Sequence, residues 1–436
     1  MSIPGALLLL VALATSGQCT DNCYDHQTVD YKTSFSPVEC GQQCSVTPFF
    51  SPDHSVNMYL DLIESATESI DIYTPGFTSW SRCTYYKKAC DNECIGCSLT
   101  EQRNESFPIF PALLNAMHLR NVSVRLLTNN FSQPTCQDRI TPLDWLFLNG
   151  AAIKFYQTTT FMHSKYVMVD KGKRTSVSSV NFSQTSFTKN REAGVVLEKC
   201  DCPTIAFYKS VFDSDWATAD EYVITSKYST SELDYITDKS LMEYPSPPRY
   251  VVPGAYVTPL TTYDAVTVRN GYTSPDNART TIMDQLKSVK SSLEVAIYQI
   301  TDKGLCDQIS TLHHNGVNVS LLVSATIVSS TDWKDAQQCY CQLYQNGMKD
   351  IQKSLKNFRF AHQKYWIIDG KAVHLSTGNW SPSDFPSGEV YPAHAPHSVN
   401  RDLLVAMEGE DIVNAFYTVF QNDWAAGTEW EPKYCN

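Results

Sequence analysis

Positive charge and long hydrophobic runs are both scarce in this 436-residue sequence. Lysine and arginine together number 34, against 46 aspartates and glutamates, which gives a formal net charge of −12. This balance argues against a broad basic surface that follows a nucleic-acid duplex, although a few lysines converging in a cleft still create a local positive field. After residues 1–19, no stretch is long and apolar enough to cross a bilayer, so we predict no transmembrane anchor.

The N-terminus and the cysteines predict a cellular compartment. Residues 1–19 resemble a secretory signal peptide, because a short apolar run from Ala6 to Ala14 precedes small residues, although no basic side chain comes first. The 15 cysteines fit an oxidising environment in which disulfides form, and we expect Cys339 and Cys341 to pair with other positions. We therefore expect the protein to be secreted or to reside in the endolysosomal lumen.

Asparagine sequons of the form N-x-S support the same compartment. Four of them are predicted to carry glycans, and these begin at Asn104, Asn121, Asn130 and Asn318. Two more begin at Asn181 and Asn379, inside the repeated motif described next. Because the repeat places both of these asparagines in a cleft, we expect their side chains to be unmodified.

One ten-residue pattern occurs twice. Residues 161–170 read FMHSKYVMVD and residues 361–370 read AHQKYWIIDG, so both contain the spacing H-x-K-x4-D. We expect the first stretch to be a strand, in which alternate side chains share a face and His163 and Lys165 project the same way. The second copy supplies His362 in the same context.

Further similarity follows each copy of the motif. A strand ending in asparagine comes first, at Asn181 and at Asn379, and an Asn-Arg-acid triplet then supplies Glu192 and Asp402. An amphipathic helix and an apolar strand precede each motif, and a helix ending in Asp-Trp closes each half. A repeat of this length, alternating helix and strand, predicts two similar domains rather than a short-period solenoid.

The predicted fold class is therefore α/β, with two similar lobes packed as a single-chain pseudo-dimer, each a mixed β-sheet flanked by helices. Proline density between the halves predicts a linker. The predicted organisation is a signal peptide, a cysteine-rich N-terminal segment, a first lobe, a proline-rich linker and a second lobe, over residues 1–19, 20–50, 51–240, 241–265 and 266–436.

Two histidines on similar lobes suit a two-step displacement at phosphorus. Of His163 and His362, one attacks phosphorus as a neutral imidazole and forms a phosphohistidine, while the other donates a proton to the leaving oxygen. The scheme requires no metal and no other cofactor. The supporting groups are two lysines that hold the non-bridging oxygens, two asparagines that add donors, and two acids that accept from a ring Nδ1–H, namely Lys165, Lys364, Asn181, Asn379, Glu192 and Asp402.

These motifs resemble those of the phospholipase D superfamily, in which H-x-K-x4-D followed by G-S-x-N and N-x-E occurs twice. The chain departs from that pattern where Ser178 stands for glycine, where Thr377-Gly378 lies in the second G-S-x-N, and where Asp402 replaces glutamate. Asp402 is the shorter acid, and the resemblance implies that it nevertheless contacts a histidine.

The resemblance also implies roles for individual residues. It implies that His163 is the attacking histidine, and that the motif aspartates Asp170 and Asp369 are structural rather than chemical. Three further stretches are similar to the lumenal, glycosylated members numbered three and four, which are endolysosomal 5′ exonucleases on single-stranded nucleic acid: Cys200-Asp201-Cys202, Gly378-Asn379-Trp380-Ser381 and Asp423-Trp424. Single-stranded nucleic acid is therefore the preferred substrate.

The sequence leaves several alternatives open. A phospholipase or transphosphatidylase acting on glycerophospholipids would use the same histidines, and a non-catalytic secreted binding protein would retain the fold. Residues 381–399 form an insertion relative to the first half, and Tyr391, His394 and His397 within it are candidates for substrate selection at the cleft mouth. An ordinary surface loop is the alternative. The oligomeric state also stays open, a homodimer included.

Overall fold

The computed structural model describes residues 35–77, 108–129, 142–156, 160–200, 203–224, 228–239, 260–386 and 399–435. Within these ranges, no helix combines the length and apolar character that a membrane span needs. Several predicted features lie outside them: the signal peptide, most of the linker, two sequons and the three candidate loop residues, namely residues 1–19, residues 241–259, Asn104, Asn130, Tyr391, His394 and His397.

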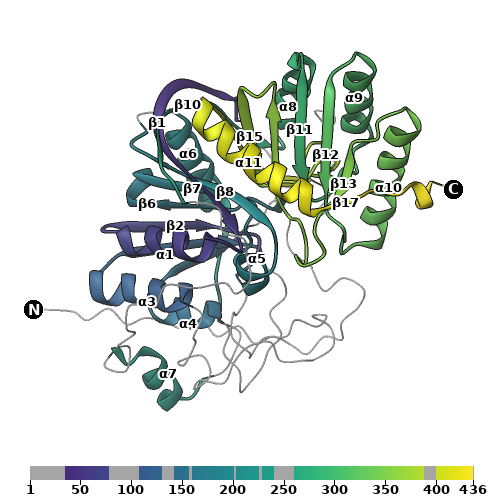
Figure 1. Cartoon of the computed structure of the whole chain (residues 1–436). Helices are drawn as coiled ribbons and strands as arrows, with labels where there is room; N and C mark the ends of the chain where they lie inside the picture. The colour runs from purple at the N-terminus through teal and green to yellow at the C-terminus, as the bar shows by residue number, and fades with distance from the viewer. Residues whose placement is uncertain are drawn as a thin grey trace, which may run out of the picture.

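The first lobe, coloured purple to teal in Figure 1, contains a mixed sheet with helices on both sides. Its elements are β1 (Val38–Ser51), α1 (Ser55–Ser65), β2 (Ser69–Tyr73), α3 (Ile109–Arg120), β3 (Ser123–Thr128), α4 (Pro142–Leu148), β4 (Ala152–Phe155), β5 (Phe161–Met162), β6 (Tyr166–Val169), η1 (Asp170–Gly172), β7 (Arg174–Ser178), α5 (Gln184–Thr188), β8 (Glu192–Glu198), α6 (Pro203–Thr218), β9 (Asp220–Glu221) and α7 (Thr230–Thr237).

The second lobe, coloured green to yellow, repeats this order of elements except for β5, η1, α5 and α7. It consists of β10 (Tyr263–Ser274), α8 (Ala278–Ser288), β11 (Ser292–Ile297), α9 (Lys303–His314), β12 (Asn318–Val323), α10 (Ser330–Gln345), β13 (Ile351–Lys353), β14 (Lys364–Ile368), β15 (Ala372–Ser376), β16 (Asn400–Glu408), α11 (Glu410–Ala426), β17 (Thr428–Glu429) and η3 (Pro432–Tyr434).

The two sheets join edge to edge. In the first lobe the strands run β9-β4-β3-β2-β6-β7-β8-β1, and in the second they run β10-β16-β15-β14-β11-β12-β13-β17. Antiparallel pairing between β1 and β10 connects the lobes. Strands β2, β3 and β4 of the first lobe are parallel, as are β11, β12 and β13 of the second. A helix lies in each connection between them, because parallel neighbours need a crossover. The predicted pseudo-dimer of mixed α/β lobes is confirmed.

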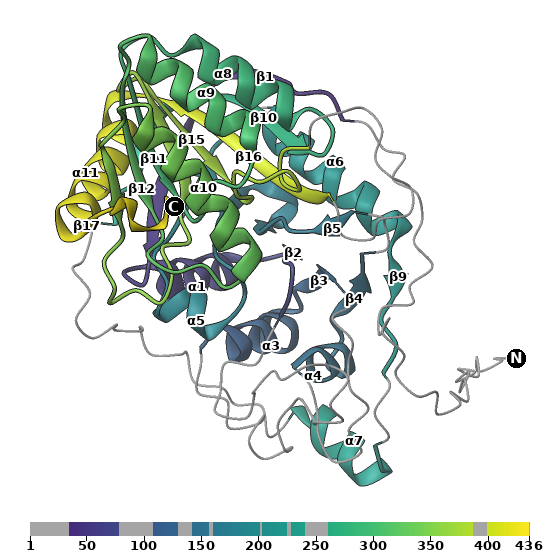
Figure 2. The same ribbon diagram turned by 90° about the vertical axis from the view of Figure 1, so that its right-hand side faces the viewer.

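Among the described residues, three hydrophobic clusters are buried. One lies between α1, α3 and α4 and the first sheet, and its counterpart lies under α8, α9 and α10 in the second lobe (Figure 2). The third lies between the lobes and contains apolar residues of α6, α11, β1 and β10. This shared core, together with the β1–β10 pairing, fixes one lobe against the other.

The N-terminal boundary of the first lobe differs from the predicted one. The cysteine-rich segment was expected to end at residue 50, but β1 begins at Val38 and lies between β8 and β10. Its apolar residues Val46 and Phe50 are buried in the core between the lobes, to which α6 and α11 also contribute. The following helix starts at Ser55, and β10 likewise starts at Tyr263, inside the predicted linker.

Disulfides connect elements that are distant in sequence. Cys44 of β1 pairs with Cys200 just after β8. The expected involvement of Cys339 and Cys341 is confirmed: Cys339 joins α10 to α9 through Cys306, and Cys341 joins α10 to Cys435. The described sequons at Asn121 and Asn318 are exposed, at the end of α3 and the start of β12, and their glycosylation stays a prediction.

Candidate active site

The two H-x-K segments cross from one lobe toward the other, and the first is not one continuous strand as expected. Strand β5 pairs with β16 of the second lobe, whereas β6 pairs with β2 of its own lobe. His163 lies between these two strands, and the Nζ of Lys165 donates to the His163 carbonyl. A change of pairing partner, rather than strand alternation, therefore sets the relation between His163 and Lys165.

Backbone hydrogen bonds hold each histidine against the opposite lobe. The His163 amide donates to the carbonyl of Arg401 at 2.9 Å, and the His362 amide donates to the carbonyl of Arg191 at 2.7 Å. Each arginine is the middle residue of an Asn-Arg-acid triplet. The acid that follows it is consequently presented to the histidine of the other lobe.

Side-chain contacts follow the same crosswise pattern. The Nδ1 atom of His163 lies 3.1 Å from Oδ1 of Asp402, and the Nδ1 atom of His362 lies 2.8 Å from Oε2 of Glu192. Both acids are buried. The contact of the shorter Asp402 with a histidine is thus present. Engagement of Nδ1 by a carboxylate leaves Nε2 of each ring for chemistry.

Polar side chains of each lobe orient its own acid. Glu192 accepts from the hydroxyl of Ser179 at 2.7 Å and from the amide of Asn190 at 2.9 Å. Asp402 accepts from the hydroxyl of Thr377 at 2.7 Å. These donors limit the rotation of the carboxylates, and so they fix the orientation of the imidazole rings.

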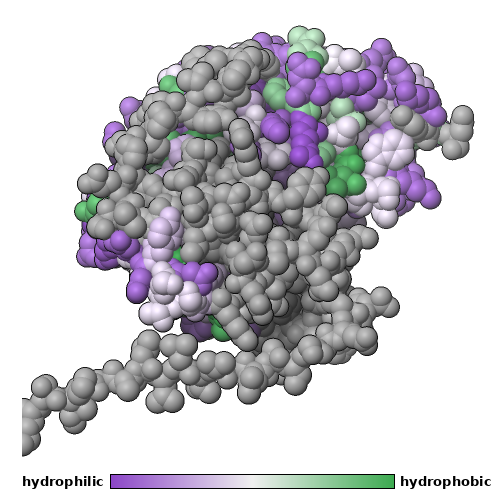
Figure 3. Space-filling view, turned by 90° about the horizontal axis from the view of Figure 1, so that it is seen from below, coloured by the Kyte–Doolittle hydropathy of each residue, from purple (hydrophilic) through white to green (hydrophobic). Residues whose placement is uncertain are grey.

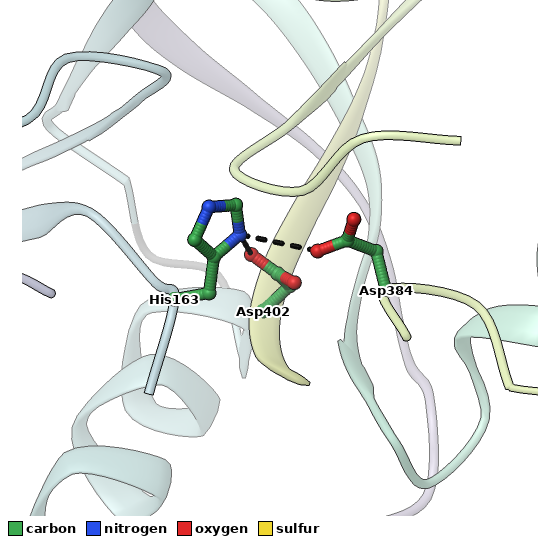
Figure 4. A group of neighbouring side chains, drawn as sticks. All are labelled: His163, Asp384 and Asp402. Atoms are coloured by element: carbon green, nitrogen blue, oxygen red, sulfur yellow. Dashed lines mark hydrogen bonds and ion pairs between the residues drawn. The ribbon is translucent and has the colours of Figure 1, made fainter. Parts of the chain in front are cut away.

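Sequence reasoning missed a third carboxylate, Asp384, in the loop that follows β15. Its Oδ1 lies 3.1 Å from Nδ1 of His163, and Figure 4 shows the second ring nitrogen pointing away from both Asp384 and Asp402. Asp384 accepts from the amide of Asn400 at 2.7 Å and from the hydroxyl of Ser381 at 2.6 Å. The available signal was Ser381-x-x-Asp384 directly after Asn379, at the start of the insertion.

The two histidines have opposite pKa shifts. Burial lowers the pKa of His362 to about 4, and Glu192 offsets only part of that effect. Burial and Lys165 also lower the pKa of His163, but Asp402 and Asp384 outweigh them and its pKa is raised. Near neutral pH the pair therefore favours a protonated His163 beside a neutral His362.

The carboxyl groups around His163 are coupled. Burial raises the pKa of Asp402, and the charge of Asp384 adds to the increase. Burial also acts on Asp384, but the His163 cation keeps the pKa of this carboxyl below its ordinary value. Asp384 is therefore the acid that stays ionised most readily beside the imidazolium.

Both motif lysines are fully buried near the histidines. Burial lowers the pKa of Lys165 to about 8 and that of Lys364 to about 7, although neighbouring carboxylates oppose the shift. Each ammonium donates to the carbonyl of the histidine two residues earlier in the chain. Both cations are thereby held where an anion near the histidines would meet them.

Asn181 and Asn379 come three residues after β7 and β15. The Oδ1 atom of each is buried and has no hydrogen-bond partner among the described residues. A buried acceptor without a donor is unfavourable, whereas the opposite amide orientation would present N–H donors at the same place. No contact between either asparagine and a histidine defines its role, which stays a proposal.

Buried ion pairs fix the two triplets across the interface between the lobes. Arg191 contacts Asp423 of α11 at 2.9 Å and Asp53 at 3.0 Å. Arg401 contacts Asp215 of α6 at 3.0 Å and also reaches Asp276. Each arginine thus joins an acid of its own lobe to an acid of the other lobe, just beside the residues that face the histidines.

The motif aspartates lie at turns away from the histidine pair. Asp170, at a φ of 50°, accepts from the backbone amides of Thr67, Glu68 and Ser69 through Oδ1 at 2.7–3.1 Å. Asp369 makes the same contacts with residues 290–292. Each carboxylate therefore ties the turn after the motif strand to the helix–strand connection of its own lobe.

Replacing Asp170 with alanine is expected to destabilise the fold by about 1–2 kcal/mol, because three amide donors lose their acceptor. Burial would raise the pKa of Asp170, but the Thr67 hydroxyl and the amides lower it to about 2 from 3.8. The stabilisation is therefore complete above pH 4 and is lost as the pH falls through about 2. Urea denaturation of Asp170→Ala across this range measures it, with the exposed Asp284→Ala as control. An equal loss at every pH would contradict it.

His163, Asp384 and Asp402 together are a set of side chains that could hold a metal ion. The oxygen atoms facing Nδ1 already accept from other donors, however: Oδ1 of Asp384 accepts from Asn400, and Oδ1 of Asp402 accepts from Thr377. The buried ammonium of Lys165 also disfavours a second cation there. The donor set fits a protonated imidazole better than a metal ion.

A duplicated α/β fold that brings two histidines, two lysines and crosswise acids together defines a class of two-lobed enzymes with one shared site. The sequence matches the family model described as "Cardiolipin synthase, PLD-like domain" over residues 59–216 and 282–424, which is more than half of the chain. The chain therefore belongs to the phospholipase D-like family, as the sequence motifs predicted.

The individual proteins that this chain resembles share less than a third of their residues with it in the aligned regions. Mitochondrial cardiolipin hydrolase of Xenopus laevis is 28% identical over 115 residues, which is 26% of this chain and 52% of that protein, so the chain spans about half of that relative's length. The crystal structure of phosphatidylserine synthase from Haemophilus influenzae covers 90% of both chains, with a TM-score of 0.58 and 12% identity, which shows a common fold. The family member Nuc from Salmonella typhimurium covers 38% of this chain and 99% of its own, with 18% identity and a TM-score of 0.31.

Proposed function

We propose that this protein is a phosphodiesterase that works through a phosphohistidine intermediate. The observation that carries the proposal is the crosswise pair: each histidine comes from one lobe, and its Nδ1 contacts a buried acid of the other lobe. Opposite protonation states of two neighbouring imidazoles are what a displacement with one nucleophile and one proton donor requires. The non-catalytic alternative leaves the burial of both lysines beside these histidines without a purpose.

The proposed reaction has two steps. The neutral imidazole attacks phosphorus through Nε2, and the P–O bond to the leaving group breaks as the other histidine donates its proton. Water then attacks the phosphohistidine, giving a proton to that second histidine while the P–N bond breaks. Lys165 and Lys364 offset the charge on the non-bridging oxygens, and Asn181 and Asn379 are proposed as additional donors. No metal ion is needed in this scheme.

For the substrate, we propose single-stranded nucleic acid, on the resemblance of three stretches of this sequence to the lumenal 5′ exonucleases. A secreted or endolysosomal, glycosylated protein fits that proposal. Among the described residues, the large hydrophobic side chains that are exposed are scattered, and most of the described surface in Figure 3 is hydrophilic. A polar surface fits a soluble polyanion better than a lipid interface.

A glycerophospholipid is the second candidate. It is favoured by the relatives named above, a cardiolipin hydrolase and a phosphatidylserine synthase. The same histidines would attack a lipid diester, and an alcohol in place of water would make the enzyme a transferase.

The two candidates can be separated by a paired turnover assay of the glycosylated protein in EDTA, from acid to neutral pH. One sample contains a 5′-hydroxyl single-stranded oligonucleotide, and the other contains phosphatidylcholine vesicles with a little ethanol. Stepwise release of mononucleotides supports the nuclease, and phosphatidylethanol supports the lipid enzyme. Turnover of neither substrate, with or without added divalent cations, would count against the proposed phosphodiesterase.

A further inference from the structure

The two halves of the site differ at several equivalent positions, and the first of these is Gly378. Ser178-Ser179-Val180 of the first lobe corresponds to Ser376-Thr377-Gly378 of the second, because the amides of Val180 and Gly378 both donate to the hydroxyl oxygen of the serine two residues earlier, at 3.1 and 2.9 Å. In the first lobe the side chain of Val180 fills this position and is fully buried. In the second lobe no side chain does.

The space left by Gly378 is occupied by two carboxyl groups. A Cβ atom added to Gly378 would lie 2.6 Å from Oδ2 of Asp402 and 2.9 Å from Oδ1 of Asp384. A side chain such as that of Val180 is therefore incompatible with this pair of acids. The glycine permits a second acid beside His163 that the first lobe has no room for.

Asp384 also has a defined counterpart. Ser186 of the first lobe and Asp384 of the second each donate an amide to the serine three residues earlier, at 3.3 and 3.1 Å. The asparagine of each triplet also donates its side-chain amide to one of these residues. Asn190 donates to the hydroxyl of Ser186 at 3.4 Å, and Asn400 donates to the carboxylate of Asp384 at 2.7 Å. In the second lobe an acid thus replaces a serine.

The length of the triplet acid explains why the extra carboxyl group matters. In the first lobe Asn190 reaches Glu192 directly, whereas in the second lobe the equivalent asparagine reaches Asp384. Asp402 is one methylene shorter than glutamate, and Asp384 supplies a second oxygen at the same 3.1 Å from His163. One carboxyl group thus contacts Nδ1 of His362, whereas two carboxyl groups contact Nδ1 of His163.

We propose that Asp384 is a positioning residue that keeps His163 in the role of general acid, which makes His362 the nucleophile that forms the phosphohistidine. This inference rests on the proposed phosphodiesterase function. It reverses the order that the family resemblance implies, since that resemblance makes His163 the attacking residue. The three positions that differ between the lobes, Gly378, Asp384 and Asp402, act together in this assignment.

Each step balances with this assignment. Nε2 of His362 forms the bond to phosphorus, and the leaving oxygen takes the proton from Nε2 of His163 as its own bond to phosphorus breaks. His163 then accepts a proton from the attacking water, whose oxygen replaces Nε2 of His362 on phosphorus. At the end His163 is again protonated and His362 is again neutral.

The charged groups around each ring fix the expected pH dependence. His163 faces Lys165, Asp402 and Asp384, whereas His362 faces Glu192, Lys364 and Lys165. Activity should therefore rise with pH as His362 loses its proton, at a pKa of about 4. It should fall at higher pH as His163, whose pKa is raised, loses its own.

Asp384→Asn tests the positioning role through the pH profile of kcat/KM on whichever diester, oligonucleotide or phosphatidylcholine, the paired assay identifies. Loss of this carboxylate leaves only Asp402 to oppose burial and Lys165, which lower the pKa of His163, so the alkaline limb should move to lower pH by roughly one unit or more. The plateau should stay level or fall. The exposed Asp284→Asn serves as control, with both limbs unchanged.

Two results of this experiment would overturn the proposal. An unmoved alkaline limb would mean that Asp384 does not act on His163. A plateau higher than that of the native enzyme would mean that His163 attacks as a neutral base, because a lower pKa then increases the productive population. Thermal unfolding of Asp384→Asn identifies a loss of activity that is due to folding alone.

A second experiment locates the covalent intermediate directly and does not depend on Asp384 variants. Bis(p-nitrophenyl) phosphate has a leaving group that needs no general acid, so His163→Ala should release a burst of about one p-nitrophenol per site and then stall. After an alkaline quench and trypsin digestion, the phosphoryl group should be on the peptide of residues 360–364. His362→Ala should give no burst.

The opposite pattern would overturn the assignment while leaving the phosphodiesterase intact. It would consist of a burst in His362→Ala, none in His163→Ala, and a phosphoryl group on the peptide of residues 155–165. If the unmodified enzyme turns over neither this probe nor the two substrates of the paired assay, the proposed function fails, and the inference fails with it.

Discussion

Replacement of either histidine by alanine should lower kcat/KM for an unactivated diester by about 10⁴-fold or more, because each removes a group that acts only in the transition state. The double variant should be hardly worse than the single variants, since His163 and His362 act as a unit. Steady-state kinetics on the native substrate measures both effects. His314→Ala, at an exposed position at the end of α9, provides the matched histidine control.

Partial activity in both single variants would contradict the two-histidine mechanism. Additive losses would do so in another way, because independent contributions are not expected from two groups that exchange one proton with the same diester. Circular dichroism of each variant distinguishes a chemical loss from unfolding, since both rings are largely buried, with 15% and 12% of their side-chain surface exposed.

The largest expected effect on stability comes from Arg191. Arg191→Ala should lower the free energy of unfolding by about 3–5 kcal/mol, because Asp423 and Asp53 would keep buried charge without their shared cation. The change also affects both lobes at once, since Asp423 belongs to α11. Equilibrium denaturation in urea measures the loss. Lys303→Ala, which removes an exposed pair with Asp307, should cost about 0.5 kcal/mol or less.

A companion variant separates the charge from the packing. Arg191→Met keeps much of the side-chain volume but removes the cation, so it should remain nearly as destabilised as Arg191→Ala. If Arg191→Met were as stable as the native protein, packing rather than the ion pair would hold the triplet in place. Activity should fall in both variants, since the backbone of Arg191 positions His362.

The repeat was enough to predict much of this molecule. Two copies of H-x-K-x4-D with matching followers predicted duplicated α/β lobes, and His163 and His362 each lie beside an acid of the kind expected. The sequence did not predict that each histidine contacts the acid of the other lobe. This arrangement depends on β5 joining β16 of the other lobe, and such long-range pairing leaves no local pattern in the sequence.

Asp384 illustrates a second limit. Its counterpart in the first lobe is Ser186, which is not an acid, so the repeat itself gives no sign of a carboxylate at this position. In sequence, residues 381–386 begin the insertion of the second half, although Asp384 contacts His163. The position of β1 was missed for a related reason: the cysteines of residues 20–50 indicated disulfides, whereas the buried edge between β8 and β10 arises only in the assembled pair.

The edge-to-edge sheet and crosswise acids have a consequence for how such a site arises. Two identical chains joined in this way would give both histidines the same environment, and only the momentary location of one proton would distinguish donor from nucleophile. Fusing the copies into one chain removes that equivalence, because each half can then change on its own. In this protein a valine and a serine in one half correspond to a glycine and an aspartate in the other. After tandem duplication, the roles of proton donor and nucleophile can therefore be fixed by the sequence of each half rather than by the position of one proton.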